Sequence, residues 1–361
     1  MADSPSPGGT LVAPNVRDFS VLAGQLGDWL ADRLDDATDL RLENFEYPRG
    51  AGQSHETILF DAHWRAAGES RSTGLAVRIK PTSFTVFLDD MFEEQYHLMR
   101  VLNAGGRVPV ARVHWLERDP RILGAPFFVM ERLHGRVAVS HPSYMESGWV
   151  AEATAEQRAR LWGQAVRALA ALQAVPRDAL GFLAPAEGMS GFEAEWDRWD
   201  RFLRHLERAG RPLPEHRRVW ALLRDRMPAD PPPGLVWGDA RIGNILVDEN
   251  FDVVALMDWE QPSLGGALHD LGWWLFNQRV KIRDNGGRPL PGIPGRDETI
   301  GIWAETTGIR PDHVEWYEAF AGLKTASLSI NMMDMRGQVP PGADYAETPQ
   351  MRALQEFLRD G

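Results

Sequence analysis

The feature that most constrains the fold is a change in the spacing of apolar residues along the chain. Between Leu40 and Leu133, short apolar runs rich in branched and aromatic residues alternate with turns, among them ETILFDAHW, GLAVRIK, ARVHWLE and APFFVMERL. After Gly135, apolar residues recur at helical spacing, and Thr154 with Gln157 forms the sequence signature of a capping box. This order indicates an α+β protein with a β-rich N-terminal part and a mainly α-helical C-terminal part.

Two helices are expected before or within the β-rich part. One covers residues 16–35, and the other covers 91–106, where MFEEQYHLMRVLNAGG interrupts the strand-like runs. The start of the chain is rich in Ser, Pro and Gly, which indicates a disordered tail. We therefore divide the chain into a tail (1–15), an N-terminal lobe (16–133) and a C-terminal lobe (134–361).

Composition excludes several classes of protein. The 361 residues include no cysteine, so disulfides, thiolate zinc sites and a cysteine nucleophile are excluded. A net charge of −12 disfavours nucleic acid as a partner and is compatible with a cationic small molecule. No run approaches the ~20 apolar residues that span a bilayer, and the start lacks the features of a signal peptide. We expect a soluble, cytoplasmic protein without a membrane partner; the oligomeric state stays open.

The stretch LVWGDARIGNILVDENFDVVALMDWE, residues 235–260, carries the chemistry. Its apolar runs predict a short β-hairpin, with Asp239 and Asn244 before it and Asp258 after it. The interval between Asp239 and Asn244 equals that in the H-R-D-x-x-x-x-N catalytic loop of protein kinases. Phosphoryl transfer needs a carboxylate that accepts the proton of the attacking hydroxyl, and hard oxygen ligands for Mg²⁺. Asp239 suits the first role, and Asn244 and Asp258 suit the second.

WGDARIGN followed by LMDWE resembles the aminoglycoside phosphotransferase and choline kinase group of kinase-like enzymes. That group's usual pattern is H-G-D-x-x-x-x-N followed by I-D-[FW]-E, and Trp237 stands where the group usually has His. The resemblance covers roughly residues 40–335 and implies a two-lobed protein-kinase-like fold with an N-terminal nucleotide-binding lobe. SLGGALHDLGWW resembles the group's G-D-P-x-x-D-L-A stretch, which implies that Asp270 is a buried organiser of the catalytic loop.

The resemblance also predicts the nucleotide contacts of the N-terminal lobe. PRGAGQSHET would cover the phosphates with a turn that carries Gly50, Gly52 and Ser54, whose backbone amides can approach phosphate oxygens. The sequence has no GxxxxGK[ST] motif, which excludes a P-loop enzyme. In APFFVMERLHG, Met130 would lie behind the adenine, and the backbone of Glu131 and Leu133 would hydrogen-bond its edge.

The cation that holds the phosphates has two candidates. The group's Lys position falls on Arg78, and Lys80 lies two residues on and therefore on the same strand face. Arg can hold phosphate in a bidentate way, so Arg78 is the first choice and Lys80 the second. The helical partner that pairs with this cation in the group would be Glu93, Glu94 or Gln95, and the sequence does not select one of them.

Two further expectations concern the helical lobe. The helix in EAEWDRWDRFLRHLERAG carries acids that could supply negative charge to an acceptor pocket, namely Glu193, Glu195, Asp197 and Asp200. Asp312 with Glu315 predicts the N-terminal cap of a late helix that runs to about Met333.

We therefore expect an ATP- and Mg²⁺-dependent O-phosphotransferase that acts on a hydroxylated small molecule, with Asp239 as the catalytic carboxylate. An aminoglycoside is one candidate acceptor, choline-like and hydroxyacyl compounds are others, and the choice between ATP and GTP stays open. A protein substrate is disfavoured because no DFG or APE segment follows the motif. Two alternatives are a catalytically silent nucleotide-binding regulator, suggested by Arg at the Lys position, and a metal-dependent phosphohydrolase.

Overall fold

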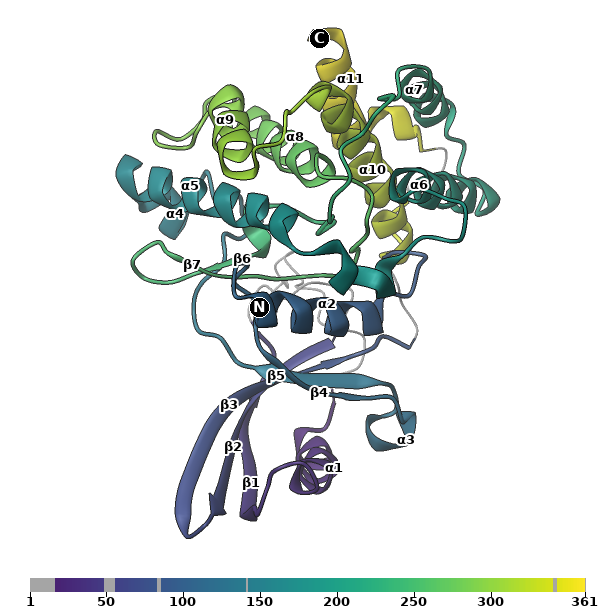
Figure 1. Ribbon diagram of the computed structural model, residues 1–361. Helices are drawn as coiled ribbons and strands as arrows, with labels where there is room; N and C mark the ends of the chain where they lie inside the picture. The colour runs from purple at the N-terminus through teal and green to yellow at the C-terminus, as the bar shows by residue number, and fades with distance from the viewer. Residues whose placement is uncertain (1–16, 49–55, 83–85, 141, 340–342, 361) are drawn as a thin grey trace, which may run out of the picture. The chain divides into compact units, whose positions relative to one another are not determined.

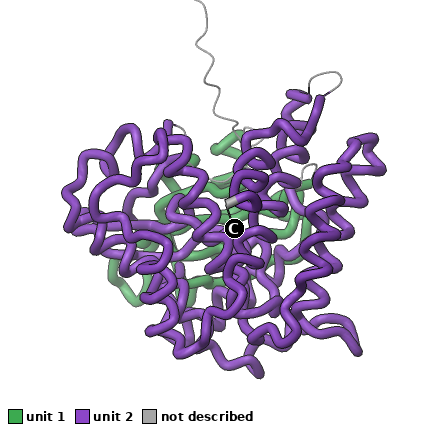
Figure 2. Tube along the Cα trace, turned by 90° about the horizontal axis from the view of Figure 1, so that it is seen from above, with its two compact units in different colours: residues 1–85, 112–133 green, residues 86–111, 134–361 purple. Residues whose placement is uncertain are grey.

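The computed structural model describes residues 17–48, 56–82, 86–140, 142–339 and 343–360. The chain divides into two compact units, which Figure 2 distinguishes by colour. The first contains residues 1–85 and 112–133, and the second contains residues 86–111 and 134–361. Within the described part, no helix is both long and apolar enough to cross a membrane.

The first unit is an antiparallel five-stranded sheet with the strand order β1-β2-β3-β5-β4. Its elements are α1 (Phe19–Ala31), β1 (Thr38–Glu46), β2 (Glu56–Ala66), β3 (Glu69–Ile79), β4 (Val113–Glu117), α3 (Pro120–Leu123) and β5 (Phe127–Glu131). The tight turn between β2 and β3 consists of Ala67 and Gly68, both with positive φ, which is the geometry that two-residue hairpin loops favour.

The two faces of this sheet have different surroundings. The apolar face of α1 packs on one of them, and the resulting core includes Leu26 of α1, Phe60 of β2 and Val77 of β3. Since successive side chains of a strand point to opposite faces, Arg78 lies on the face away from α1. Its cross-strand partner Phe128 shares that face. The first unit therefore presents Arg78 on the side of the sheet that its own helix leaves uncovered.

The second unit is mainly helical. Its helices are α2 (Phe92–Gly105), α4 (Trp149–Glu152), α5 (Ala155–Ala171), α6 (Gly191–Arg208), α7 (Pro214–Asp225), α8 (His269–Asp284), α9 (Arg296–Thr307), α10 (Val314–Met335) and α11 (Pro349–Asp360) (Figure 1). Short 3₁₀ turns add η1 (Leu172–Ala174), η2 (Arg177–Leu183), η3 (Ile242–Asn244) and η4 (Tyr345–Glu347). One hairpin, β6 (Ile245–Val247) with β7 (Val253–Leu256), interrupts the helices, as the sequence predicts.

Helix ends follow the sequence in one case and depart from it in another. The capping box of α5 is formed, because Thr154 and Gln157 exchange hydrogen bonds between side chain and backbone. The predicted cap of α10 by Asp312 is wrong. The helix begins at Val314 after His313, which has a φ of 60°, and the Asp312 carboxylate pairs with Arg310 instead.

The segment 86–111, which we expected in the N-terminal lobe, belongs by its packing to the helical unit. Asn331 of α10 donates a hydrogen bond to the carbonyl of Val86 at 2.8 Å, which anchors the start of the segment. Within α2, the His97 ring lies 5.7 Å from that of Phe182 in η2. These contacts with elements far along the chain give α2 its place, and its sequence spacing cannot reveal them.

The long helices α8 and α10 pack closely at the centre of the second unit. A Cβ atom added at Gly272 of α8 would lie 2.5 Å from the carbonyl carbon of Tyr317 in α10. Only glycine allows this approach, so the position is fixed by packing and not by a turn. Helix α8 thereby places its first turns, which include Asp270 and Trp273, beside the segment that leads into the hairpin.

Candidate active site

The β6–β7 hairpin brings together two of the three residues singled out in the motif. Ile245 pairs with Leu256, and the amide of Met257 donates a hydrogen bond to the carbonyl of Asn244 at 2.9 Å. Asn244 therefore precedes one strand and Asp258 follows the other at the same end of the hairpin. Asp258 has a φ of 63°, in the left-handed region that few residues other than glycine adopt. Such strained backbone is often found at functional sites.

The carboxylate of Asp239 is held by three side chains. Asn244 Nδ2 donates to Oδ2 at 2.7 Å, and Arg241 Nε donates to the same oxygen at 2.9 Å. Trp273 Nε1 of α8 donates to Oδ1 at 3.0 Å. The side chain of Asp239 is 25% exposed, so it is fixed in place while part of it faces solvent. A carboxylate in this state can accept a proton from a molecule bound at the surface of the second unit.

The loop that carries Asp239 is organised by a buried acid on α8. Asp270 accepts hydrogen bonds from the backbone amides of Trp237, at 2.6 Å, and Gly238, at 2.9 Å. Burial raises the pKa of Asp270 to about 6, although the two amide bonds act in the opposite direction. Gly238 has a φ of 101°, and a Cβ there would lie 2.5 Å from the Gln261 carbonyl oxygen, so only glycine fits. This is the role that the resemblance implies for Asp270.

Trp237 connects the loop that carries Asp239 to the hairpin. Its Nε1 donates to the carbonyl of Met257 at 2.9 Å, and its ring lies 5.4 Å from that of Trp259. The side chain is fully buried. The residue at the position where the resembling enzymes usually have His is thus part of the structural core of the site.

Sequence analysis missed two members of the site, Arg241 and Trp273. Arg241 is recognisable in retrospect as a cation two residues after Asp239, in the same loop. Burial lowers its pKa, but the carboxylates of Asp239 and Asp258 outweigh that effect and raise it. Trp273 lies on α8, 34 residues from Asp239, and no local pattern marks it. Its role depends entirely on how α8 packs.

The oxygen-donor set at the hairpin fits a magnesium ion. Asn244 uses its Nδ2 for two hydrogen bonds to Asp239, and its Oδ1 is the atom suited to a hard cation. Asp258 supplies a carboxylate at the same end of the hairpin. In the described part of the chain, no group of three or more His, Asp or Glu could hold a metal ion by itself. A bound Mg²⁺ would therefore depend on oxygens from a nucleotide as well, as is usual for this ion.

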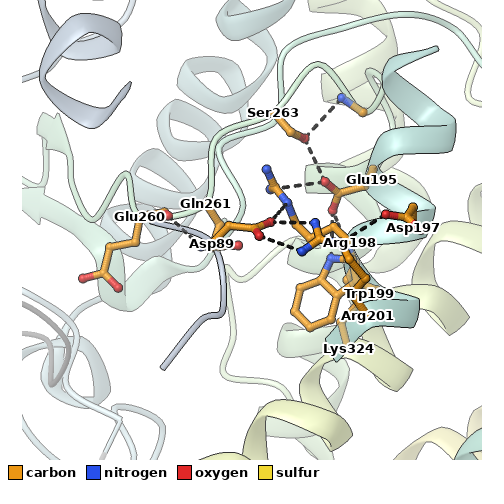
Figure 3. A network of polar contacts seen from close by, with 11 residues as sticks. Asp89, Glu195, Asp197, Arg198, Trp199, Arg201, Glu260, Gln261, Ser263 and Lys324 are labelled. Atoms are coloured by element: carbon orange, nitrogen blue, oxygen red, sulfur yellow. Dashed lines mark hydrogen bonds and ion pairs between the residues drawn. The ribbon is translucent and has the colours of Figure 1, made fainter. Parts of the chain in front are cut away.

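A buried charge network supports the segment that leads into the loop with Asp239 (Figure 3). Ser263 forms a two-way backbone bridge with Val236, at 2.8 and 3.2 Å, and its Oγ donates to Glu195 of α6 at 2.9 Å. Lys324 of α10 donates to the other oxygen of Glu195 at 3.0 Å. Burial opposes the charged form of Glu195, yet Lys324 and Arg198 hold its pKa below the usual range. The network thus joins two helices to the segment immediately before the catalytic loop.

The acids of α6 that we expected to supply negative charge to an acceptor pocket all have partners in the structure, and their contribution to such a pocket stays a prediction. Glu195 belongs to the buried network described above. Glu193 completes the capping box of α6 with Ser190. Asp197 pairs with Arg201 at 3.1 Å. The fourth acid, Asp200, pairs with Arg217 and Arg204.

The first unit holds the predicted nucleotide-binding residues Arg78, Lys80, Met130, Glu131 and Leu133. Gly50, Gly52 and Ser54 lie outside the described residues. Met130 is paired with Ala76 across the sheet and shares the face of Arg78. Lys80 follows the end of β3, and its amide donates to the carbonyl of Pro126 at 2.9 Å.

Part of the backbone at the end of β5, near Leu133, already forms hydrogen bonds within the first unit. The amide of Glu131 donates to the carbonyl of Arg112 at 2.9 Å, and the Glu131 carboxylate accepts from the Arg112 amide at 2.7 Å. The Glu131 amide is therefore engaged within the sheet. On α2 in the second unit, Gln95 is buried, whereas Glu93 and Glu94 are half-buried. Which of these three is the helical partner stays a prediction.

Comparison with known proteins identifies a family. The model of the phosphotransferase enzyme family (APH) matches residues 48–297. Among curated proteins, the chain is 26% identical over 243 residues to the probable acyl-CoA dehydrogenase IBR3 of Arabidopsis thaliana, covering 65% of this chain and 28% of that protein. It is 22% identical over 320 residues to human acyl-CoA dehydrogenase family member 11, covering 84% of this chain and 40% of that protein. The chain thus spans well under half the length of these curated relatives.

Solved structures share the fold. A proposed aminoglycoside phosphotransferase from Ralstonia eutropha JMP134 superposes with a TM-score of 0.66 at 22% identity, covering 93% of this chain and 98% of that one. A thermostable mutant of the aminoglycoside phosphotransferase APH(4)-Ia, in ternary complex with ADP and hygromycin B, gives 0.55 at 14% identity, covering 93% and 99%. At these identities the likeness establishes a two-lobed, kinase-like α+β fold.

Proposed function

Because this chain belongs to the phosphotransferase enzyme family, we propose that it transfers the γ-phosphoryl group of ATP to a hydroxyl group of a small molecule. The observation that carries the proposal is the gathering of Asp239, Asn244 and Asp258 around one hairpin. Asp239 is held by three donors, and the other two offer oxygens at the hairpin end. Phosphoryl transfer depends chiefly on such positioning and charge stabilisation.

The reaction assigns each group a task. The acceptor hydroxyl oxygen forms a bond to the γ-phosphorus, the bond from that phosphorus to the β–γ bridging oxygen breaks, and ADP leaves. Asp239 accepts the hydroxyl proton and later releases it to solvent. Asn244 and Asp258 would hold Mg²⁺, which neutralises charge on the phosphates when bound. Arg241, bonded to Asp239, adds a positive charge beside the reacting groups.

The first unit would bind the nucleotide. Arg78 is our first choice to hold the phosphates and Lys80 the second. Gly50, Gly52 and Ser54, which lie outside the described residues, stay predicted phosphate contacts. Arg78 shares its sheet face with Met130, and this arrangement supports a nucleotide placed against that face.

Contacts to the adenine edge would come from the backbone at the end of β5. Because the Glu131 amide is bonded to Arg112, we assign the carbonyl of Glu131 and the amide of Leu133 to the adenine edge. We further propose a cytoplasmic location.

A silent regulator is the second candidate, and one observation favours it: Arg78 stands where the resembling enzymes have Lys. The hydrogen bonds around Asp239 support catalysis, because nucleotide binding alone does not need a carboxylate fixed by three donors.

The acceptor is a hydroxylated small molecule, for which aminoglycosides, amino alcohols and hydroxy acids form the test panel.

The test is ADP release from Mg·ATP with this panel, for the wild type and Asp239→Asn. We expect one compound class to stimulate ADP release and to yield a phosphorylated product in the wild type, and Asp239→Asn to be slower by about 10²–10⁴-fold. Asp225→Asn, an exposed acid, is the control and should match the wild type. Equal product formation by wild type and Asp239→Asn would overturn the assignment. A Mg·ATP thermal shift without any phosphorylated product would favour the regulator.

A further inference from the structure

A small cavity begins two residues beyond Asp239, inside the second unit. It has a volume of about 50 Å³. Its walls come from η3 and the loop before it, from α8, from α5, and from Ser140 and Tyr144. The lining residues include Arg241, Trp274, Gln278 and Lys281. One ordered water needs roughly 10–15 Å³, so the cavity has room for one compact functional group and not for a whole metabolite.

Positive charge dominates the described walls of this cavity. Arg241 and Lys281 both line it, and no Asp or Glu is among its described lining residues. Burial lowers the pKa of Lys281, and Arg241 adds to that effect, whereas Asp284 and Glu146 raise it from outside the lining. Arg241 is already paired with Asp239, so Lys281 is the cation in excess. An anion placed between the two cations would relieve their repulsion.

Hydrogen-bond donors are also available there. The ammonium group of Lys281 has three N–H donors, and one of them donates a hydrogen bond to the carbonyl of Ser140 at 3.2 Å. Trp274 is 2% exposed, and its Nε1 has no hydrogen-bond partner among the described residues. A buried donor without a partner costs about 1–3 kcal/mol. Trp274 lines the cavity, so a ligand oxygen that reached Nε1 would recover that cost. Gln278 donates to the carbonyl of Pro294 at 2.7 Å, and its Oε1 has no partner in the described chain.

We propose that this cavity is the acceptor subsite for a compact anionic group, so that the acceptor is a hydroxylated carboxylic acid. The inference rests on the proposed function, because it takes Asp239 as the group that receives the hydroxyl proton. Arg241 lines the cavity and its guanidinium is bonded to Asp239. A carboxylate held between Arg241 and Lys281 would therefore place the rest of the acceptor toward Asp239. The negative net charge of the whole chain does not govern this local preference, since the acids of α6 are engaged elsewhere.

The test compares matched compounds. Hydroxy acids of four to eight carbons are offered beside their neutral amides, the corresponding hydroxyalkyl phosphates, and an aminoglycoside. ADP release and phosphorylated product report turnover, and thermal shifts with AMP-PNP and Mg²⁺ report binding. We expect at least one hydroxy acid to be bound and phosphorylated at least tenfold better, in kcat/KM, than its amide. A preference for the hydroxyalkyl phosphate over the carboxylate would keep the anionic subsite and overturn the carboxylate assignment.

Two variants locate the anion. Lys281→Met should raise KM for the hydroxy acid at least tenfold and leave KM for ATP unchanged. Trp274→Phe, which keeps an aromatic ring of smaller size and removes the donor, should raise the same KM severalfold. Arg224→Gln, an exposed cation, is the control and should change neither value.

The outcomes separate this inference from the proposed function. Turnover of amides or aminoglycosides at least as good as that of acids, or an unchanged KM in both cavity variants, would overturn the subsite and leave the phosphotransferase standing. If no compound is turned over, the thermal shift decides: stabilisation by a hydroxy acid in wild type but not in Lys281→Met supports the subsite, and its absence overturns it. Loss of the Mg·ATP shift itself would reject the proposed function.

Discussion

The indole of Trp273 donates a hydrogen bond to Oδ1 of Asp239 at 3.0 Å, and this contact connects the central helix α8 to the proposed catalytic carboxylate. The other carboxylate oxygen is bonded to Arg241 and Asn244 from the loop itself. Asp239 is thus fixed from two sides, one local in sequence and one distant. The packing of α8 against α10 consequently bears on the geometry of the site.

We expect Trp273→Phe to lower kcat while leaving KM for ATP unchanged. The substitution keeps an aromatic ring, although a smaller one, and removes a hydrogen bond to a carboxylate. Such a bond contributes about 1.5–3 kcal/mol, which corresponds to roughly tenfold to a hundredfold in rate. Steady-state kinetics with the acceptor found in the panel would measure it. Trp149→Phe, which loses an indole bond to the Val137 carbonyl, is the matched control. A rise in KM for ATP with unchanged kcat would reject the positioning role.

Asn244→Ala should increase the Mg²⁺ concentration needed for half-maximal activity. Even groups one step removed from a metal change its affinity by about 10–100-fold, so loss of a ligand should cost at least roughly tenfold. Titration of ADP release with Mg²⁺ measures the effect. Asn244→Asp keeps an oxygen ligand but loses the donor to Asp239, so it should retain Mg²⁺ affinity with a lower kcat. Equal Mg²⁺ curves for wild type and Asn244→Ala would exclude this ligand.

Asp270 organises the loop that carries Asp239, so we expect its substitution to lower both the stability of the protein and kcat. In Asp270→Asn, the side-chain NH₂ would replace one of the two oxygens that accept hydrogen bonds from backbone N–H groups. One backbone N–H would then be left without an acceptor, at a cost of about 1–3 kcal/mol. Urea unfolding and kcat should both register the change, whereas Asp225→Asn should alter neither. Wild-type kcat in Asp270→Asn would show that the loop does not depend on these bonds.

Glu195→Gln should destabilise the protein because it leaves Lys324 buried without a carboxylate. Breaking a buried ion pair by removing one partner costs about 3–5 kcal/mol. The double variant Glu195→Gln with Lys324→Met should recover part of that loss, since no charge is then stranded. Glu193→Gln is the matched control, because Gln preserves the capping box. Equal unfolding free energies for the single and double variants would argue against a stranded charge.

The buried histidine of α7 predicts a pH dependence of stability. His216 is fully buried, and burial lowers its pKa to about 4, whereas the unfolded chain has the ordinary value of about 6.5. Below that value the unfolded state binds a proton that the folded state does not, so stability is lost as pH falls from about 6.5 to about 4, by up to about 1.4 kcal/mol per pH unit. His216→Phe should lose less stability over this window in urea unfolding, and His205→Gln should behave as the wild type. Parallel curves for His216→Phe and wild type would refute the assignment.

Much of the architecture follows from local patterns. The apolar spacing predicts the strand-rich part and the helical part, the hairpin around residues 245–256, and the capping box at Thr154, all of which are present. The spacing of Asp239, Asn244 and Asp258 indicates the family, which the family model confirms over residues 48–297. These features depend on short-range geometry, and short-range geometry is encoded in neighbouring residues.

The remainder depends on contacts between distant segments. The placement of α2 with the helical unit and the donation by Trp273 to Asp239 are examples that no local pattern contains. The cationic cavity is another, because the sequence reports a net charge of −12 for the whole chain. Only packing brings Arg241 and Lys281, 40 positions apart, to one cavity while pairing the acids of α6 with other partners. Local residue order thus determined the elements and the motif; tertiary packing decided which charges meet at the site, because the Coulomb interaction depends on distance in space and on burial.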